Sequence, residues 1–175
     1  MRYKLLENMN KLVIFDFDDT LVKTDSYIYV THRDGKTKTL TPGEYAVYDK
    51  QPGDTFDYSD FSQVTRPVLI KAYVELLRRM VKSAMGKTVY ILTARAAYKP
   101  VYEFIRDIGI KNVMVIALGD SNPEKKADWI EQQIKDKGYS SIFFADDSPK
   151  NVDAVKNRLK AYPDIEKTIK LVTHS

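Results

Sequence analysis

Hydrophobic residues gather in four short, nearly continuous runs that are widely spaced along the chain. These runs cover residues 12–15, 89–92, 113–117 and 142–145. A strand with one face in water alternates apolar and polar residues, whereas a strand covered on both faces reads as a continuous apolar run. The four runs therefore predict buried strands of a parallel sheet. A further apolar stretch at 169–172 predicts an additional edge strand.

Between these runs, apolar residues recur at the three-to-four-residue spacing of amphipathic helices. Gly109 closes the second helical segment, Asn122 and Pro123 open the third as cap and first-turn proline, and Pro149 opens the fourth. Strands that alternate with helices form right-handed crossovers. We therefore expect a single domain over residues 1–175 of class α/β, a three-layer α/β/α sandwich with a mainly parallel Rossmann-like sheet. The helical segments cover residues 69–80, 101–108, 127–134 and 152–159.

Residues 21–64 interrupt this alternation. Two stretches at 27–30 and 36–40 flank Asp34-Gly35, and such a dipeptide between strand-like runs is a strong hairpin signal. The segment is too long and too rich in turn residues for a simple crossover. We predict a small flap or cap inserted after the first strand, over the carboxyl edge of the sheet.

The flap also carries a helix signal and many aromatic residues. Thr41 and Glu44 have the spacing of a capping box, which predicts a short helix that ends before Pro52. Aromatic rings in a small insertion either pack together as its core or stack on a nucleobase, and we favour packing. Seven residues make up this aromatic set: Tyr27, Tyr29, Tyr45, Tyr48, Phe56, Tyr58 and Phe61.

Composition adds only broad limits. At 175 residues the chain is long enough for one sizeable core, and 43% hydrophobic with 30% charged residues is ordinary for a globular protein. The absence of cysteine excludes disulfides and thiolate metal sites and fits a reducing compartment. The N-terminus has no apolar stretch typical of a signal peptide, so we expect a cytoplasmic protein without a membrane partner. A net charge of +4 favours anionic ligands only weakly.

Polar and charged residues follow each of the four predicted strands directly. In open α/β sheets the ligand crevice lies beyond the carboxyl ends of the strands, so these side chains should converge. Acidic groups packed this closely repel one another and raise one another's pKa, which makes a purely structural role unfavourable. In chain order the residues are Asp16, Asp18 and Asp19; Thr93 and Arg95; Asp120 with Lys125 and Lys126; and Asp146 and Asp147.

A divalent cation would turn this repulsion into attraction. Ligation by carboxylate oxygens alone suits Mg²⁺, which binds one or two carboxylates together with a substrate phosphate. Zn²⁺ would favour histidine or cysteine, and neither His32 nor His174 lies in these motifs or at a ligand spacing. The sequence therefore predicts Mg²⁺ as the cofactor.

Asp16 and Asp18 lie two residues apart, which places both side chains on the same side of an extended chain. Such a pair can divide the chemistry between a nucleophile and a general acid/base. The Thr93 hydroxyl and the Lys126 ammonium could then hold phosphoryl oxygens. Alone, Thr93 would read as a helix N-cap, and its place in register with the other motifs favours phosphate binding.

The motifs Asp16-Phe-Asp18-Asp-Thr20, Thr93, Lys126 and Asp146-Asp147 resemble the four signature motifs of the haloacid dehalogenase (HAD) superfamily of phosphotransferases. They occur in the family's order, each at a predicted strand end or the start of the next helix. The resemblance covers about residues 11–159 apart from the flap. Together the four motifs are specific, whereas the first alone is only moderately so.

The resemblance implies roles for individual residues. Asp16 resembles the nucleophile that forms an aspartyl-phosphate, and Asp18 the acid/base that protonates the leaving alcohol and then activates water. The metal would be held by the Asp16 carboxylate, the Asp18 backbone carbonyl and Asp146, with Asp147 sharing the site or lying behind it. An aspartate at position 18 is similar to the phosphatases of the family.

Other positions leave alternatives open. Lys126 matches the family's lysine better than Lys125 does, by its place before the first core residues of the helix. Asp19 stands where the family commonly has glycine. Arg95 either reaches a substrate phosphate or ribose oxygen or is a surface charge. Asp120 is more simply a cap of the turn into the third helix than a catalytic group.

The expected activity is that of a Mg²⁺-dependent phosphomonoester hydrolase. A small flap leaves room for a bulky substrate, and a soft resemblance to the phosphatase domain of phage-type polynucleotide kinases favours nucleotides or polynucleotide 3′-phosphate ends. Sugar phosphates and phosphoproteins are the alternative substrates. The rival classes are a response-regulator receiver domain, whose acceptor aspartate follows the third strand where this chain has Gly119-Asp120, and a non-catalytic phospho-acceptor or binding module.

Overall fold

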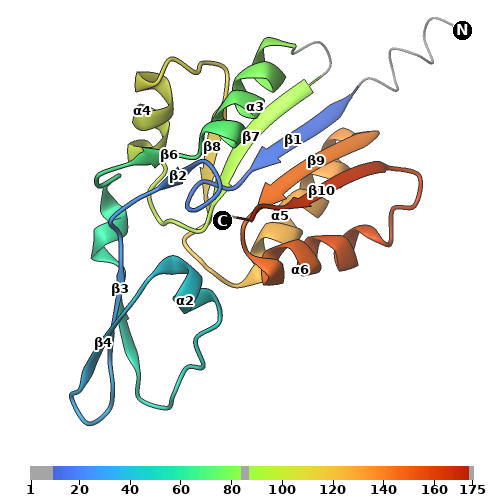
Figure 1. Cartoon of the computed structure of the whole chain (residues 1–175). Coiled ribbons are helices and arrows are strands. Elements are labelled where there is room, and N and C mark those ends of the chain that lie inside the picture. Colours follow the sequence, from blue (N-terminus) through green and yellow to red (C-terminus); the bar gives the residue numbers. More distant parts are fainter. Residues whose placement is uncertain (1–9, 84–86, 174–175) are drawn as a thin grey trace, which may run out of the picture.

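The computed structural model describes residues 10–83 and 87–173. The N-terminal segment and His174 lie outside these residues. The core is a five-stranded sheet in the order β10-β9-β1-β7-β8, and all its neighbouring strands are parallel (Figure 1). The predicted α/β fold is thereby confirmed. The strands are β1 (Lys11–Phe15), β7 (Lys87–Thr93), β8 (Met114–Ala117), β9 (Ser141–Asp146) and β10 (Glu166–Leu171).

Four helices cover the two faces of the sheet, α3 and α4 on one and α5 and α6 on the other (Figure 1). The central strand β1 serves both layers, because Val13 and Phe15 pack on the α3/α4 side while Leu12 and Ile14 pack on the α5/α6 side. This is why the run reads as continuously apolar. The helices are α3 (Lys71–Lys82), α4 (Lys99–Asp107), α5 (Pro123–Lys137) and α6 (Pro149–Leu159).

The predicted helix boundaries are confirmed for three of these four helices. Gly109 follows α4 with φ at 86°, a conformation that favours glycine. Asn122 caps α5 and Ser148 caps α6, each by accepting a hydrogen bond from a backbone N–H of the first turn. The first helix was predicted from Leu69, which is wrong: Leu69 pairs with Val22 in a short antiparallel contact.

The strand order places the crevice between β1 and β9. From β1 the chain passes to β7 and then β8 on one side, with α3 and α4 as crossovers, and it then returns to β9 on the other side of β1. At such a switch point the crossover helices leave in opposite directions and open a gap at the carboxyl ends of the strands. The residues that follow β1 and β9 therefore lie at its base.

The flap is a separate three-stranded antiparallel sheet with a short helix (Figure 1). The hairpin at Asp34-Gly35 and the capping box of Thr41 and Glu44 are confirmed. The third strand and the antiparallel pair at the base of the flap were not predicted. The flap elements are β3 (Ile28–Thr31), β4 (Thr37–Leu40), α2 (Pro42–Ala46), β5 (Thr55–Asp57) and the 3-10 helix η1 (Ser59–Ser62), and the base pair is β2 (Val22–Lys23) with β6 (Val68–Leu69).

Aromatic rings of the flap pack on one another. Tyr45, Tyr48, Phe56 and Phe61 surround the buried aliphatic residues of β3 and β4. Phe56 is stacked on Tyr58 with ring centroids 6.2 Å apart. The packing interpretation of these aromatics is therefore confirmed for this cluster. No helix of the described residues combines the length and apolar character needed to cross a membrane.

Candidate functional site

Asp16 follows β1 directly and lies at the base of the crevice, with only 7% of its surface exposed. Its backbone N–H donates to the Ala145 carbonyl of β9, which extends the parallel pairing by one residue. The Lys126 ammonium donates to Asp16 Oδ1 at 2.8 Å, and the Thr20 hydroxyl donates to Oδ2 at 3.1 Å. The carboxylate is thus held at both oxygens in a fixed orientation.

Lys126 reaches the site from the first turns of α5 and bridges two carboxylates. Its Nζ lies 2.8 Å from Asp16 Oδ1 and 2.7 Å from Asp146 Oδ2. Burial by itself lowers the pKa of this ammonium, but Asp146 and Asp16 outweigh burial and raise the pKa above its usual value. Lys126 therefore stays charged. Lys125 is exposed, so the structure brings only Lys126 of the two to the carboxylates.

Asp146 ends β9 and is fully buried. Its Oδ1 accepts the backbone N–H of Ser148 at 2.9 Å, and its Oδ2 accepts the side-chain amide of Asn151 at 3.1 Å. Burial and the charge of Asp16 raise the pKa of Asp146 to about 6, against the opposite effect of Lys126. Ionising this carboxyl is therefore costly in the absence of a further cation.

The pKa of Asp147 is raised even more than that of Asp146. Burial, in the first place, and the charge of Asp16, in the second, raise the pKa of Asp147 well above its usual range. Asp16, Asp146 and Asp147 each offer an oxygen, and these atoms lie within 4.8 Å of one another. The cluster therefore contains three carboxylates and one ammonium group. Its excess negative charge and its oxygen donors suit a hard divalent cation.

Asp18 does not join this cluster with its carboxylate. Both of its oxygens instead accept hydrogen bonds from Arg95, each at 2.8 Å. Arg95 was expected at a substrate phosphate or at the surface, yet only 4% of its surface is exposed. The sequence alone could not pair two side chains that lie 77 positions apart.

Thr93 ends β7 and is buried. Its hydroxyl oxygen accepts the backbone N–H of Arg95 at 3.1 Å, which closes the turn that follows the strand. The alternative reading of Thr93 as a helix N-cap is wrong, because Tyr98 occupies the cap position of α4. Thr93 therefore lies at the carboxyl end of the sheet beside the strand that carries Asp16.

Several polar residues complete the site. Thr20 and Asn151 hydrogen-bond the two central carboxylates, and the sequence pattern predicted a role for neither, although Thr20 ends the first motif and Asn151 follows the last one by four residues. Asp120 accepts the backbone N–H of Asn122 and shapes the turn into α5, as predicted. Asp19 adopts φ at 60°, in the left-handed region that glycine adopts freely and that aspartate tolerates.

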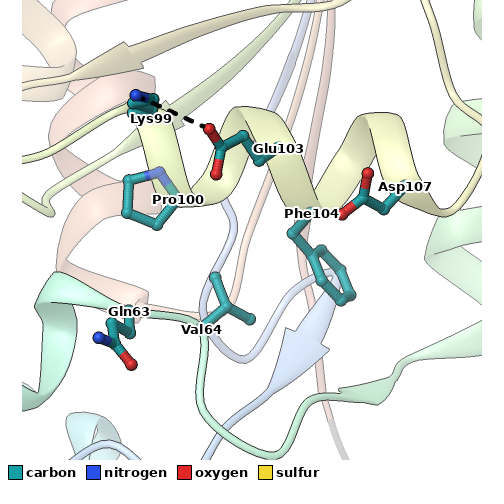
Figure 2. Close-up of a pocket in the computed structure, with 7 residues that line it drawn as sticks. All are labelled: Gln63, Val64, Lys99, Pro100, Glu103, Phe104 and Asp107. Atoms are coloured by element: carbon teal, nitrogen blue, oxygen red, sulfur yellow. Dashed lines mark ion pairs between the residues drawn. The ribbon is translucent and has the colours of Figure 1, made fainter.

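A separate hollow of about 500 Å³ lies between α4 and the segment that follows η1 (Figure 2). None of the residues that line it belongs to the carboxylate cluster. The lining is mixed, with charged residues of α4 around Pro100 and Phe104. The full set is Gln63, Val64, Lys99, Pro100, Glu103, Phe104 and Asp107.

No protein-family model and no curated protein matches this chain. Among solved structures, the chain is similar to the Legionella pneumophila effector Ceg4, with a TM-score of 0.50 over 93% of this chain and 86% of that chain. The sequence identity is 15%. A likeness at this identity shows the α/β fold alone.

Proposed function

We propose that the chain is a Mg²⁺-dependent phosphomonoester hydrolase of the HAD superfamily that acts through an aspartyl-phosphate. The observation that supports this most is the buried Asp16 carboxylate, fixed at the switch point between Lys126 and two further carboxylates. A purely structural cluster would not need three acids around one ammonium. Asp18 follows Asp16 by two residues, and Thr93 ends the adjoining strand β7.

In the first half-reaction a carboxylate oxygen of Asp16 attacks phosphorus, and the bond between phosphorus and the ester oxygen breaks. The leaving alkoxide takes a proton from the Asp18 carboxyl, so an alcohol leaves and an acyl phosphate remains. In the second half-reaction Asp18 takes a proton from water as the water oxygen attacks phosphorus. The bond between phosphorus and Asp16 then breaks, which releases phosphate and restores both carboxyl groups.

The Lys126 ammonium and the Thr93 hydroxyl would stabilise the charge that develops on the phosphoryl oxygens, since that hydroxyl only accepts from the Arg95 N–H and keeps its own O–H to donate. Asp16, Asp146 and Asp147 would hold the cation, together with the Asp18 backbone carbonyl that the resemblance suggests. When bound, Mg²⁺ would neutralise negative charge on both the carboxylates and the phosphoryl group. The Lys126 ammonium would then be able to interact with the phosphoryl group of a substrate bound next to Asp16.

The substrate class is inferred from the size of the flap. Its helix α2 has only five residues, so it covers little of the crevice and leaves room for an extended substrate. We propose nucleotides or polynucleotide 3′-phosphate ends first, and sugar phosphates or phosphoproteins second. The aromatic cluster contributes little to this choice, because its rings already pack on one another.

A non-catalytic phospho-acceptor module is the second candidate. The observation in its favour is that the Asp18 carboxylate pairs with Arg95 and does not join the cluster of Asp16, Asp146 and Asp147. Such a module would accept a phosphoryl group on Asp16 and retain it. The two candidates differ in the lifetime of the acyl phosphate.

Hydrolysis of p-nitrophenyl phosphate in the presence of Mg²⁺ tests the proposal. We expect turnover by the parent protein and a loss of about 10³-fold or more in Asp16→Asn, because the amide is no nucleophile. Asp120→Asn is the matched control, since it makes the same change at an exposed turn. Turnover retained in Asp16→Asn would exclude Asp16 as nucleophile, and a stable acyl phosphate without turnover would favour the acceptor module.

A further inference from the structure

Arg95 connects two parts of the molecule that are far apart in the chain. Its Nε and Nη2 donate to the two oxygens of Asp18, each at 2.8 Å. Its Nη1 donates to the backbone carbonyls of Phe61 at 3.0 Å and Gln63 at 2.8 Å. We call residues 61–63 the return segment, because the chain leaves the flap through them.

We infer that Arg95 is a positioning residue that couples the docking of the flap to the orientation of the Asp18 carboxylate. Its consequence for turnover rests on the proposed function. The coupling itself rests on the contacts of Arg95 alone. It would make the position of the flap a determinant of proton transfer at Asp18.

The geometry of the guanidinium is the first reason. Its N–H groups point in fixed directions within one plane. When Nε and Nη2 donate to Asp18, Nη1 is therefore directed at the return segment. The guanidinium also contacts the rings of Phe17 and Phe61, whose centroids lie 5.3 and 5.2 Å from Cζ. A tilt of the guanidinium therefore disturbs both sets of hydrogen bonds.

Burial is the second reason. Only 2% of the Arg95 side chain is exposed, so donors that lose their acceptors are not rehydrated easily. The Gln63 side chain of the return segment is exposed and borders the hollow next to α4 (Figure 2), so it leaves Arg95 to hold the Gln63 carbonyl from the inner side. If this segment moves, Arg95 must find new acceptors, and its hold on Asp18 changes as well.

The arrangement orients Asp18 without enclosing it. The Asp18 side chain keeps 17% exposure, and each carboxylate oxygen has a second lone pair beyond the one that Arg95 occupies. Rotation about the side-chain bonds is restricted by the bidentate pair. An acid/base group held in this way loses less entropy on the approach to the transition state.

Arg95→Lys is the first test, because lysine keeps the charge but cannot form the fork. We expect kcat to fall about tenfold or more with KM changed far less, since general acid/base positioning acts on the chemical step. The loss should be larger for an alkyl phosphate than for p-nitrophenyl phosphate, whose leaving group needs little protonation. Arg78→Lys is the matched control, since Arg78 of α3 donates to the carbonyl of Ile108 at the C-terminal end of α4.

Hydrogen exchange is the second test and does not depend on turnover. Because coupling is reciprocal, Asp18→Asn should speed amide exchange in the return segment, although Asp18 touches it only through Arg95. Arg95→Lys should do the same, and exchange in α5 should stay unchanged in both variants.

The outcomes separate the two proposals. Unchanged exchange in Asp18→Asn would overturn the coupling whether or not the protein is active. A uniform loss of kcat for both leaving groups in Arg95→Lys would also contradict it. An inactive parent protein in which Asp18→Asn still loosens the return segment would refute the phosphatase and leave the coupling in place.

Discussion

At the scale of single residues, the carboxylates around Lys126 carry more charge than one ammonium neutralises. The pKa values of Asp146 and Asp147 are raised, in both cases by burial first and by Asp16 second. A carboxyl whose pKa is higher in the folded than in the unfolded chain binds more protons when folded. The metal-free protein should therefore lose stability as pH rises above about 4, the range where an unfolded aspartate ionises.

Asp147→Asn tests this balance of charge. In EDTA at pH 8 the variant should melt a few degrees higher than the parent, since about 1 kcal/mol corresponds to roughly 2–4 °C in a domain of this size. At pH 5 the difference should shrink, because the aspartate of the unfolded chain then lies closer to its own pKa and keeping the folded carboxyl protonated costs less free energy. Mg²⁺ should stabilise the parent more than the variant in the same calorimetric scan. A variant that melts lower than the parent at pH 8 would show that the Asp147 charge is stabilising.

The sequence predicted which residues gather at the site but not all of their partners. The sequence alone predicted that Asp16, Lys126 and Asp146 lie close together, because parallel strands have their carboxyl ends at the same edge of the sheet. The hydrogen bonds between Asp18 and Arg95 depend on how a turn after β7 folds back, and no local pattern reports that. For the same reason the sequence pattern assigned no role to Thr20, which lies in the first motif, or to Asn151.

At the scale of elements, the flap is organised around Asp54 as well as its aromatic rings. Asp54 accepts hydrogen bonds from the Tyr48 hydroxyl, the Gln51 backbone and the His32 ring, at 2.8, 2.9 and 2.7 Å. Burial raises the pKa of this carboxyl, but the hydrogen bonds from Gln51, His32 and Tyr48 lower it further, so the net shift is downward. Stability from Asp54 is thus present above about pH 4 and is lost as pH falls through the lowered pKa.

Replacement of Asp54 should loosen the flap and leave the central sheet unchanged. In Asp54→Ala we expect faster amide exchange in β3, β4 and β5 at pH 7, because three donors lose their shared acceptor. Asp34→Asn is the control, since it removes one flap carboxylate but keeps a turn sequence that suits the hairpin. Equal exchange rates in Asp54→Ala and the parent would show that aromatic packing alone orders the flap.

Element prediction succeeded where hydrophobic runs were long and failed where they were short. The central strands are buried on both faces, so their sequences are distinctive. β5 has three residues with mostly exposed side chains, and β2 and β6 have two each. Such pieces pair because the flap brings them together, and a propensity pattern cannot report this.

At the scale of the whole molecule, the flap is linked to the rest of the described chain both at its base and at its outer end. The base of the flap is the short β2–β6 pair, and Arg95 holds the return segment beside it. Further out, Ser121 donates to the Tyr45 hydroxyl at 3.4 Å in an exposed position. A long, exposed hydroxyl pair contributes little, so Arg95 should dominate the placement of the flap.

Spin labels can measure this placement directly, because the chain has no cysteine of its own. Labels at Lys36→Cys on the flap and Lys156→Cys on α6 occupy two exposed positions. In the Arg95→Lys background the distance distribution should broaden, since the carbonyls of the return segment lose guanidinium donors that the ammonium cannot replace. In the Ser121→Ala background it should stay close to that of the labelled parent. A broadening with Ser121→Ala but not with Arg95→Lys would place the controlling contact at the outer end of the flap instead of its base.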